Sequence, residues 1–227
     1  MCIRDRYKVL PFGLSTAPSV FQRLMDLVLC GLTYETCLVY LDDIIVFSKD
    51  FGGHIPRLEE VLKRLRQANL KLQPTKCSFF RRSVSFLGHV ILEDGIGVQE
   101  EKVKTVQDWP PPKNLTELRG FIGLCSYYRR FISGFSEVAA PMYKLMKKDV
   151  PFVWTSEQEE AFRRLKRCLT EAPVLGMPTS DGMFIVDTDA SNVGVGAVLS
   201  QQQENSEVVL AYASRTCLLY TSDAADE

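Results

Sequence analysis

CLVYLDDIIVF, residues 37–47, carries the strongest structural signal in this chain. Its two apolar runs, 37–41 and 44–47, are rich in β-branched and aromatic residues, which is typical of short strands. The two residues between the runs, Asp42 and Asp43, predict a tight hairpin turn. Such turns normally use Asn-Gly or Asp-Gly because the backbone needs positive φ, and adjacent carboxylates also repel each other. A turn that breaks its local rule suggests function, and crowded carboxylate oxygens suit Mg²⁺.

The charge of the chain is distributed unevenly, although the formal net charge of its 227 residues is only −1. Residues 57–82 carry eight Lys or Arg against two Glu, and residues 113–148 carry seven Lys or Arg against two Glu. Residues 181–227, by contrast, carry eight Asp or Glu against one Arg. A basic middle beside an acidic end suits a polyanion track next to metal-binding carboxylates, whereas a charge-balanced surface is the plainer alternative.

Composition and cysteine usage favour an ordinary globular protein of a reducing compartment. Hydrophobic residues make up 46% of the chain and charged residues 24%, which are typical globular values. The seven cysteines include no C-x-x-C pair, and the two histidines, His54 and His89, have no partners at zinc-ligand spacing. No apolar run approaches roughly 18 residues and no secretory signal pattern is visible, so we expect an intracellular protein without a membrane partner.

Apolar periodicity and breaker residues divide the chain into helical and extended segments. Helices are expected at 15–31 and 55–68, and three more after the proline run at 110–112, with N-caps at Asn114, Ser136 and Ser156. Short strands are expected at 70–72, 77–80 and 84–92. From residue 183 the period changes to that of strands, at 183–189, 194–200 and 208–214.

Seven segments, taken in order along the chain, resemble the reverse transcriptase and ribonuclease H region of gypsy-type LTR retrotransposon Pol polyproteins. Four of these segments are similar to the palm motifs of that family: LPFGLSTAPSVFQRLMD (10–26), YLDDIIVFS (40–48), LKLQPTKCSFF (70–80) and FLGHVI (86–91). Its connection region is resembled by LRGFIGLCSYYRRFISGFSEVAAPMYKLMKK (118–148). Its ribonuclease H start is resembled by FIVDTDASNVGVGAVLSQ (184–201), followed by AYASRT (211–216). The resemblance covers about residues 7–216.

The resemblance implies an α+β fold that runs from a polymerase into a nuclease. It comprises a partial palm with the YLDD β-hairpin and helices, a thumb, a helical connection, and the first three antiparallel strands of a ribonuclease H-like domain. The expected boundaries are 7–85 for the C-terminal part of the palm, 86–180 for the thumb and connection, and 181–216 for the ribonuclease H start. Residues 1–6 and 217–227 resemble translated adapter sequence, so we expect non-native ends and a fragment truncated on both sides.

The implied polymerase site is built around the aspartate pair. Asp42 is expected to ligate metal directly, and Asp43 to be a weaker ligand or to support the first. Two-metal phosphoryl transfer uses two Mg²⁺ ions per complete active site and at least one further carboxylate, which the family places upstream of residue 7. Lys76 is expected near the leaving pyrophosphate as an electrostatic or general-acid group, with a solvated surface lysine as the alternative.

Four further residues are implied to surround the nucleotide and the templating base pair. Phe12 and Gly13 would line the incoming nucleotide, because glycine lets the backbone approach a ligand closely. A core phenylalanine and a plain turn before a helix are the alternatives. Gln22 would contact the templating pair, or be an exposed helical glutamine. Tyr40 would lie near the primer terminus, or pack as an ordinary strand aromatic.

Two segments are implied to hold the nucleic acid. Phe86-Leu87-Gly88 resembles the hairpin that grips the primer strand, with edge-strand packing as the alternative. The sequence YYRRF, residues 127–131, interleaves aromatics with cations, which can stack on bases and neutralise phosphates. Because half of this cluster also fits an apolar helix stripe, only Arg129 and Arg130 are expected to meet nucleic acid.

Asp189 is implied to be the first carboxylate of the ribonuclease H metal site, which also hydrolyses phosphodiesters with two metal ions. Asp187 lies two residues earlier on the same strand face, but the family pattern selects Asp189. The remaining carboxylates of that site are expected beyond residue 216. We therefore expect neither polymerase nor nuclease activity from this chain alone.

The implied activity of the parent protein is RNA-directed DNA polymerisation with ribonuclease H. Its partners would be an RNA or DNA template-primer and deoxynucleoside triphosphates, in a cytoplasmic retrotransposon particle. One alternative is a non-catalytic nucleic-acid-binding remnant of a decayed element, which the intact frame and complete YLDD disfavour. Another is an unrelated metal-dependent hydrolase with paired aspartates, which the order of the palm motifs disfavours.

Overall fold

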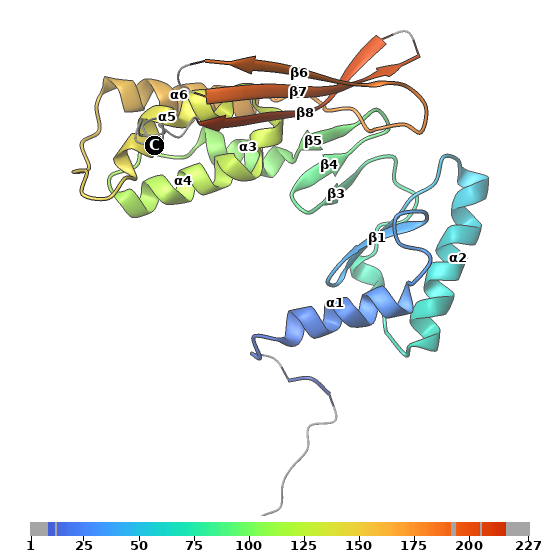
Figure 1. Ribbon diagram of the computed structural model, residues 1–227. Helices are drawn as coiled ribbons and strands as arrows, with labels where there is room; N and C mark the ends of the chain where they lie inside the picture. The colour runs from blue at the N-terminus through green and yellow to red at the C-terminus, as the bar shows by residue number, and fades with distance from the viewer. Residues whose placement is uncertain (1–8, 12, 192–193, 205, 217–227) are drawn as a thin grey trace, which may run out of the picture. The chain divides into compact units, whose positions relative to one another are not determined.

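The computed structural model describes residues 9–11, 13–191, 194–204 and 206–216, and Figure 1 labels its helices and strands. The chain divides into two compact units, Met1–Arg81 and Arg82–Glu227. Each unit is organised around its own hydrophobic core. Within the described part of the chain, no helix is both long enough and apolar enough to cross a membrane.

The first unit packs two helices against a β-hairpin. Its elements are α1 (Ala17–Val28), β1 (Cys37–Tyr40), β2 (Asp43–Val46), α2 (Phe51–Gln67) and the 3-10 helix η1 (Pro74–Lys76). The Asp50 carboxylate caps α2 by accepting a hydrogen bond from the Gly53 N–H at 2.7 Å. The buried residues come from both helices and from β1: Met25, Leu29, Cys37, Val61 and Leu65. This core fixes the hairpin against the two helices.

The strands expected at 70–72 and 77–80 do not form, so those predictions are wrong. A strand needs a hydrogen-bonded neighbour, and among the described residues of the first unit only β1 and β2 build a sheet. Leu72, Phe79 and Phe80 are instead exposed, and Phe80 has a φ of 53°. Apolar composition alone therefore does not make these segments strands.

The second unit begins with a small antiparallel sheet. Its strands are β3 (Val84–Phe86), β4 (His89–Ile91) and β5 (Ile96–Val98), in the order β3-β4-β5. The single strand expected at 84–92 is therefore wrong. Leu87 and Gly88, with φ values of 49° and 75°, form a turn that splits it into β3 and β4.

Helices follow the small sheet. They are α3 (Glu100–Gln107), α4 (Leu115–Tyr127), the 3-10 helix η2 (Arg129–Phe131), α5 (Phe135–Leu145) and α6 (Ser156–Thr170). The predicted Asn114 cap is confirmed, because its Oδ1 accepts a hydrogen bond from the Glu117 N–H at 2.9 Å. The other two predicted caps are wrong. Left-handed Gly134 precedes α5, and a capping box of Thr155 with Gln158 begins α6.

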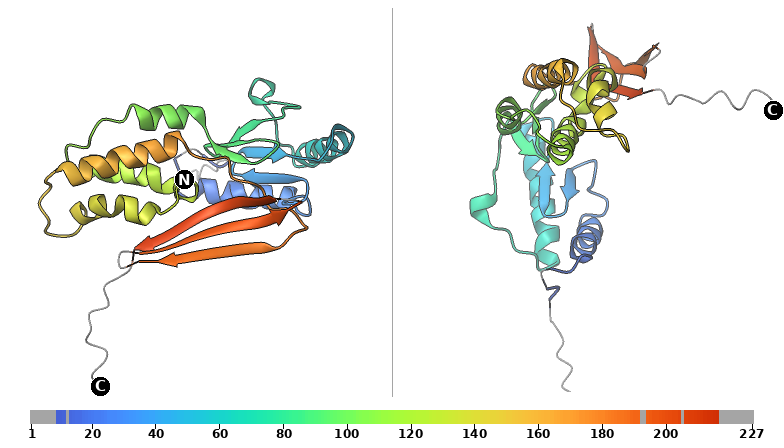
Figure 2. Two further views of the ribbon diagram at one scale, coloured as in Figure 1. Left: turned by 90° about the horizontal axis from the view of Figure 1, so that it is seen from above. Right: turned by 90° about the vertical axis from the view of Figure 1, so that its left-hand side faces the viewer.

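The second unit ends in a larger antiparallel sheet, as expected. Strands β6 (Phe184–Ala190), β7 (Gly194–Gln203) and β8 (Ser206–Thr216) pair in that order. Helix α5 lies beside both α6 and the sheet (Figures 1 and 2). The two sheets are linked through one segment, where the Ile96 N–H donates to the Leu175 carbonyl at 2.7 Å and the Gly176 N–H donates to the Val209 carbonyl at 2.8 Å. The α+β class is confirmed.

Candidate functional site

The aspartate pair lies at the tip of the β1–β2 hairpin. The register pairs Tyr40 with Asp43, so the turn residues are Leu41 and Asp42, rather than Asp42 and Asp43 as predicted. Leu41 takes a positive φ of 53° at the first turn position, as primed hairpin turns require. This conformation costs a leucine roughly 1–3 kcal/mol, and such strain clusters at functional sites. Both carboxylates are exposed, and so is Tyr40, to 52%.

Gln22 holds the strained turn from helix α1. Its Oε1 accepts a hydrogen bond from the Leu41 N–H at 2.6 Å, and its Nε2 donates to Asp26 Oδ1 at 2.8 Å. The side chain predicted to contact the templating pair is thus engaged with the YLDD turn. A contact with template stays a prediction. The sequence carried no signal for this bond, because its partners lie 19 residues apart.

The donor set at the turn fits part of a magnesium site. Mg²⁺ binds proteins through one or two carboxylates together with water and substrate phosphates. Asp42 and Asp43 present two exposed carboxylates on one hairpin. Across the residues that the structure describes, no group of three or more His, Cys, Asp or Glu side chains gathers to hold a metal ion. The pair therefore suits a site that substrate or other protein oxygens complete.

The other residues predicted around the nucleotide belong to the same unit. Gly13 has a φ of 91°, and among the described residues other than its chain neighbours no atom lies within 4 Å of the position that a Cβ would take, so its backbone is open to close approach. Phe12 lies outside the described residues. Lys76 is the exposed last residue of η1. Their approach to a nucleotide stays a prediction.

The predicted primer-gripping segment is a complete hairpin turn. Phe86 pairs with His89, and Leu87 and Gly88 form the two-residue turn between them. The Tyr127 hydroxyl donates to the Leu87 carbonyl at 2.6 Å, and the Tyr128 hydroxyl donates to the Gly88 carbonyl at 2.8 Å. Sequence reasoning missed this contact. The available signal was Tyr128 on the apolar stripe of its helix, because a buried hydroxyl must find a partner.

His89 packs behind the same turn. Its Nδ1 lies 2.9 Å from the Leu87 carbonyl oxygen, and its ring stacks on Phe131 with centroids 5.7 Å apart. Burial lowers the pKa of His89 below its ordinary value, and the nearby Arg130 charge adds to this effect. The neutral imidazole is therefore the favoured form beside the turn.

Arg129 and Arg130 have structural partners on the larger sheet. Arg129 Nη2 donates to the Ser214 carbonyl, and Arg130 Nη2 donates to the Leu210 carbonyl at 3.3 Å. The Ser214 hydroxyl also accepts a hydrogen bond from the Ser136 N–H at 2.9 Å. These bonds join η2 to backbone carbonyls of β8, and α5 to the side chain of Ser214 on the same strand. A contact of the two arginines with nucleic acid stays a prediction.

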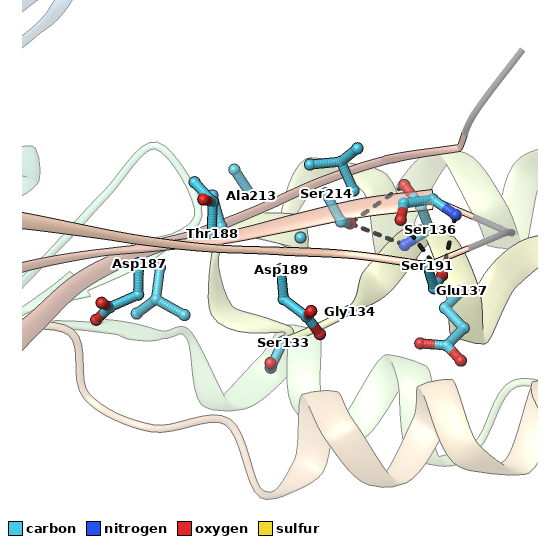
Figure 3. Close-up of a pocket in the computed structure, with 15 residues that line it drawn as sticks. Ser133, Gly134, Ser136, Glu137, Asp187, Thr188, Asp189, Ser191, Ala213 and Ser214 are labelled. Carbon is cyan, nitrogen blue, oxygen red and sulfur yellow. Dashed lines mark hydrogen bonds between the residues drawn. The ribbon is translucent and has the colours of Figure 1, made fainter.

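Asp189 lines a cavity between β6 and the start of α5. The cavity has a volume of about 300 Å³, and Ser133 and Gly134 also line it. Asp187 and Asp189 project from the same side of β6, whereas Thr188 projects from the other (Figure 3). Both carboxylates are exposed. The structure thus brings the two aspartates to one face, as the strand period predicted.

Two family models match the chain. Residues 2–91 match reverse transcriptase (RNA-dependent DNA polymerase), and residues 154–220 match the RNase H-like domain found in reverse transcriptase. The chain is 43% identical over 196 residues to the retrovirus-related Pol polyprotein from transposon 297 of Drosophila melanogaster, covering 86% of this chain and 18% of that protein. The chain belongs to the retrotransposon Pol reverse transcriptases. The resemblance to this family is confirmed, and gypsy-type membership is consistent with these relatives.

Other Pol proteins are similar to this retrotransposon Pol chain. The Pol polyprotein from transposon 412 of Drosophila melanogaster is 40% identical over 210 residues, covering 92% of this chain and 17% of that protein. The Tf2-3 polyprotein of Schizosaccharomyces pombe is 38% identical over 201 residues, covering 88% of this chain and 15% of that protein. The chain therefore spans less than a fifth of the length of these relatives.

Solved foamy viral protease-reverse transcriptases share the fold of this retrotransposon Pol chain. The complex with dsDNA matches with a TM-score of 0.79 and 27% identity, covering 92% of this chain and 44% of that one. The complex with RNA/DNA hybrid matches with a TM-score of 0.78 and 27% identity, covering 92% of this chain and 28% of that one. The likeness extends over both compact units.

Proposed function

We propose that this chain supplies polymerase and ribonuclease H residues for RNA-directed DNA synthesis by a gypsy-type retrotransposon Pol polyprotein. The observation that carries the proposal is the YLDD hairpin, which presents two exposed aspartates on a turn that Gln22 holds. It lies within residues that match the reverse transcriptase family. The substrates would be a template-primer of RNA or DNA and deoxynucleoside triphosphates. Foamy viral relatives in complex with dsDNA and RNA/DNA hybrid support this choice.

Within the polymerase site, the hairpin would place carboxylates where the primer end meets the triphosphate. Asp42 would hold metal, with Asp43 as a second ligand or support. When bound, two Mg²⁺ ions would neutralise and orient the phosphate oxygens and lower the pKa of the attacking hydroxyl. Lys76 would place positive charge near the leaving pyrophosphate. Gly13 and Tyr40 would border the nucleotide and the primer terminus.

The remaining residues would divide between strand binding and hydrolysis. We assign residues 7–85 to the palm, 86–180 to the thumb and connection, and 181–216 to the ribonuclease H start. The hairpin at Phe86-Leu87-Gly88 would grip the primer strand. Asp189 would be a Mg²⁺ ligand of the nuclease site. Its exposed side chain faces an open cavity. The parent protein would work in the cytoplasm.

The proposal is tested by replacing Asp42 with asparagine in a Pol polyprotein that carries this chain. Loss of a metal-ligating charge should reduce nucleotide incorporation by about 1,000-fold or more, because metal stabilisation of phosphoryl transfer contributes several kcal/mol. Template-primer affinity, measured by fluorescence anisotropy, should stay within about twofold, because the main attraction comes from cationic side chains. D149N is the matched control, since Asp149 is exposed on the loop between α5 and α6. Normal incorporation by D42N would refute the metal assignment.

A further inference from the structure

We propose that Tyr127 and Tyr128 are positioning residues that hold the Leu87-Gly88 turn in the shape with which it grips a primer strand. The proposal rests on the polymerase function proposed above and deepens it, because the tyrosines would act on nucleic acid through the hairpin β3–β4. It is carried by contacts between α4 and the turn, which lie 40 residues apart in the sequence.

Both carbonyl groups of the turn are bound by tyrosine hydroxyls. Tyr127 donates to Leu87 and Tyr128 donates to Gly88, at 2.6 Å and 2.8 Å. A two-residue turn has only these two carbonyls, so the pair of hydroxyls fixes the orientation of both peptide planes. Leu87 gains most from this support, because its φ of 49° is unfavourable for a residue with a side chain.

The end of α4 allows two consecutive side chains to reach one turn. Inside an α-helix, neighbouring side chains diverge by about 100°. Tyr127 is the last residue of α4, and Tyr128 departs from helical geometry with φ −98° and ψ 15°. Their rings consequently meet edge to face, with centroids 4.9 Å apart and planes at 86°. The helix end is thus shaped to the hairpin.

Gly88 and Tyr128 fit each other closely. Gly88 has a φ of 75°, and a Cβ at this residue would lie 2.8 Å from the Tyr128 hydroxyl oxygen. The next atoms that such a Cβ would meet, Tyr127 Cε1 and Tyr128 Cζ, lie at 3.7 Å and 3.9 Å, which are ordinary contact distances. A side chain at this position would therefore require the Tyr128 hydroxyl to shift, in addition to the cost of positive φ.

His89 supports the turn from the strand that follows it. The carbonyl oxygen of Leu87 has two lone pairs, so it can accept hydrogen bonds from both His89 Nδ1 and the Tyr127 hydroxyl. The imidazole centroid lies 5.4 Å from the ring of Tyr127 and 5.4 Å from that of Tyr128. Helix end, turn and strand consequently form one packed cluster.

The two tyrosines differ in exposure, which separates a positioning effect from direct contact. Tyr128 is 1% exposed, so its hydroxyl is hidden from a bound strand and must act through the turn. Tyr127 is 54% exposed, so its ring has an open face as well as its bond to the turn. Removal of the Tyr128 hydroxyl is therefore the cleaner test.

A double-mutant cycle on this chain tests the coupling. Y128F, G88A and the double variant are compared by hydrogen exchange of the β3–β4 amides. Y128F alone should speed exchange about fivefold, as expected for one lost hydrogen bond. G88A should speed exchange in both backgrounds. The acceleration that G88A causes should be at least about fivefold smaller in the Y128F background, because the hydroxyl oxygen that would lie 2.8 Å from the added Cβ is absent there. The strain of positive φ is common to both backgrounds and cancels in the comparison.

The matched control is Y212F. Tyr212 is a partly buried tyrosine of the same unit, but it lies on β8 and bonds to neither turn carbonyl. Its replacement should leave exchange of the β3–β4 amides unchanged. Additive effects of Y128F and G88A, or an equal response to Y212F, would overturn the proposal.

A second measurement asks whether the turn acts on nucleic acid. In a Pol polyprotein that carries this chain, Y128F should raise the KM for a template-primer about fivefold while kcat changes less than twofold, since the chemical groups are untouched. An unchanged KM despite coupling in the cycle would overturn the positioning role. A wild-type protein that does not extend a primer would instead refute the proposed function. In that case, coupling between Y128F and G88A in hydrogen exchange would still support the contact between the tyrosines and the turn.

Discussion

Replacing Gln22 with leucine removes the acceptor of the Leu41 N–H while keeping a side chain of similar size on α1. The Leu41 N–H then loses its 2.6 Å partner at the one turn residue with a left-handed backbone. The bond to Asp26 is lost as well, but it is exposed and contributes little. The substitution therefore isolates the link between α1 and the YLDD turn.

The expected cost follows from that one partly buried hydrogen bond. Its net contribution is about 1 kcal/mol, which corresponds to roughly fivefold more frequent opening of the turn. For a compact unit of this size, the same loss lowers the melting temperature by about 4–8 °C. The turn should loosen more than the core, because Met25, Leu29 and Cys37 are untouched.

Hydrogen exchange of the Leu41 amide, with thermal melting of the first unit, measures both effects. The control is Q67L, which makes the same replacement at an exposed glutamine at the end of α2. Q67L should leave the Leu41 amide unchanged. If Q22L exchanges at the wild-type rate, the bond from Gln22 does not hold the turn.

Two further predictions concern the second unit. Because burial lowers the pKa of His89 in the folded protein, the unfolded chain takes up a proton first as the pH falls. The free energy of unfolding should thus be fully present above about pH 6.5 and decrease below it. Urea unfolding between about pH 7.5 and pH 5.5 should show this slope in the wild type, and a persistent slope in H89Q would contradict the assignment. S214A removes the acceptor of the Ser136 N–H and should destabilise the junction of α5 and β8 by about 1 kcal/mol. Urea unfolding measures this loss. The control is S180A, which makes the same replacement on an exposed loop.

Local patterns predicted much of this fold correctly. The α+β class, the β1–β2 hairpin, the Asn114 cap and the three strands of the larger sheet all follow from near neighbours along the chain. Predictions failed where contacts with residues distant in the sequence, or the lack of a neighbouring strand, outweighed the local sequence preference. Ser136 does not cap α5, since left-handed Gly134 precedes the helix and the Ser136 N–H bonds to Ser214. The apolar runs 70–72 and 77–80 found no neighbouring strand and stayed irregular.

The aspartate pair, the tyrosine pair and Asp189 are readable in the sequence, because residue type, alternation and motif order depend only on positions close in the chain. What supports each of them depends on folding. Gln22 meets Leu41 across 19 residues, Tyr127 meets Leu87 across 40, and Arg129 meets Ser214 across 85. Such contacts form only after distant segments are packed together, and no local propensity encodes which carbonyl or N–H will lie within reach. The sequence alone thus predicted which residues are candidates for the site, whereas the tertiary structure decided which distant residues hold them in position.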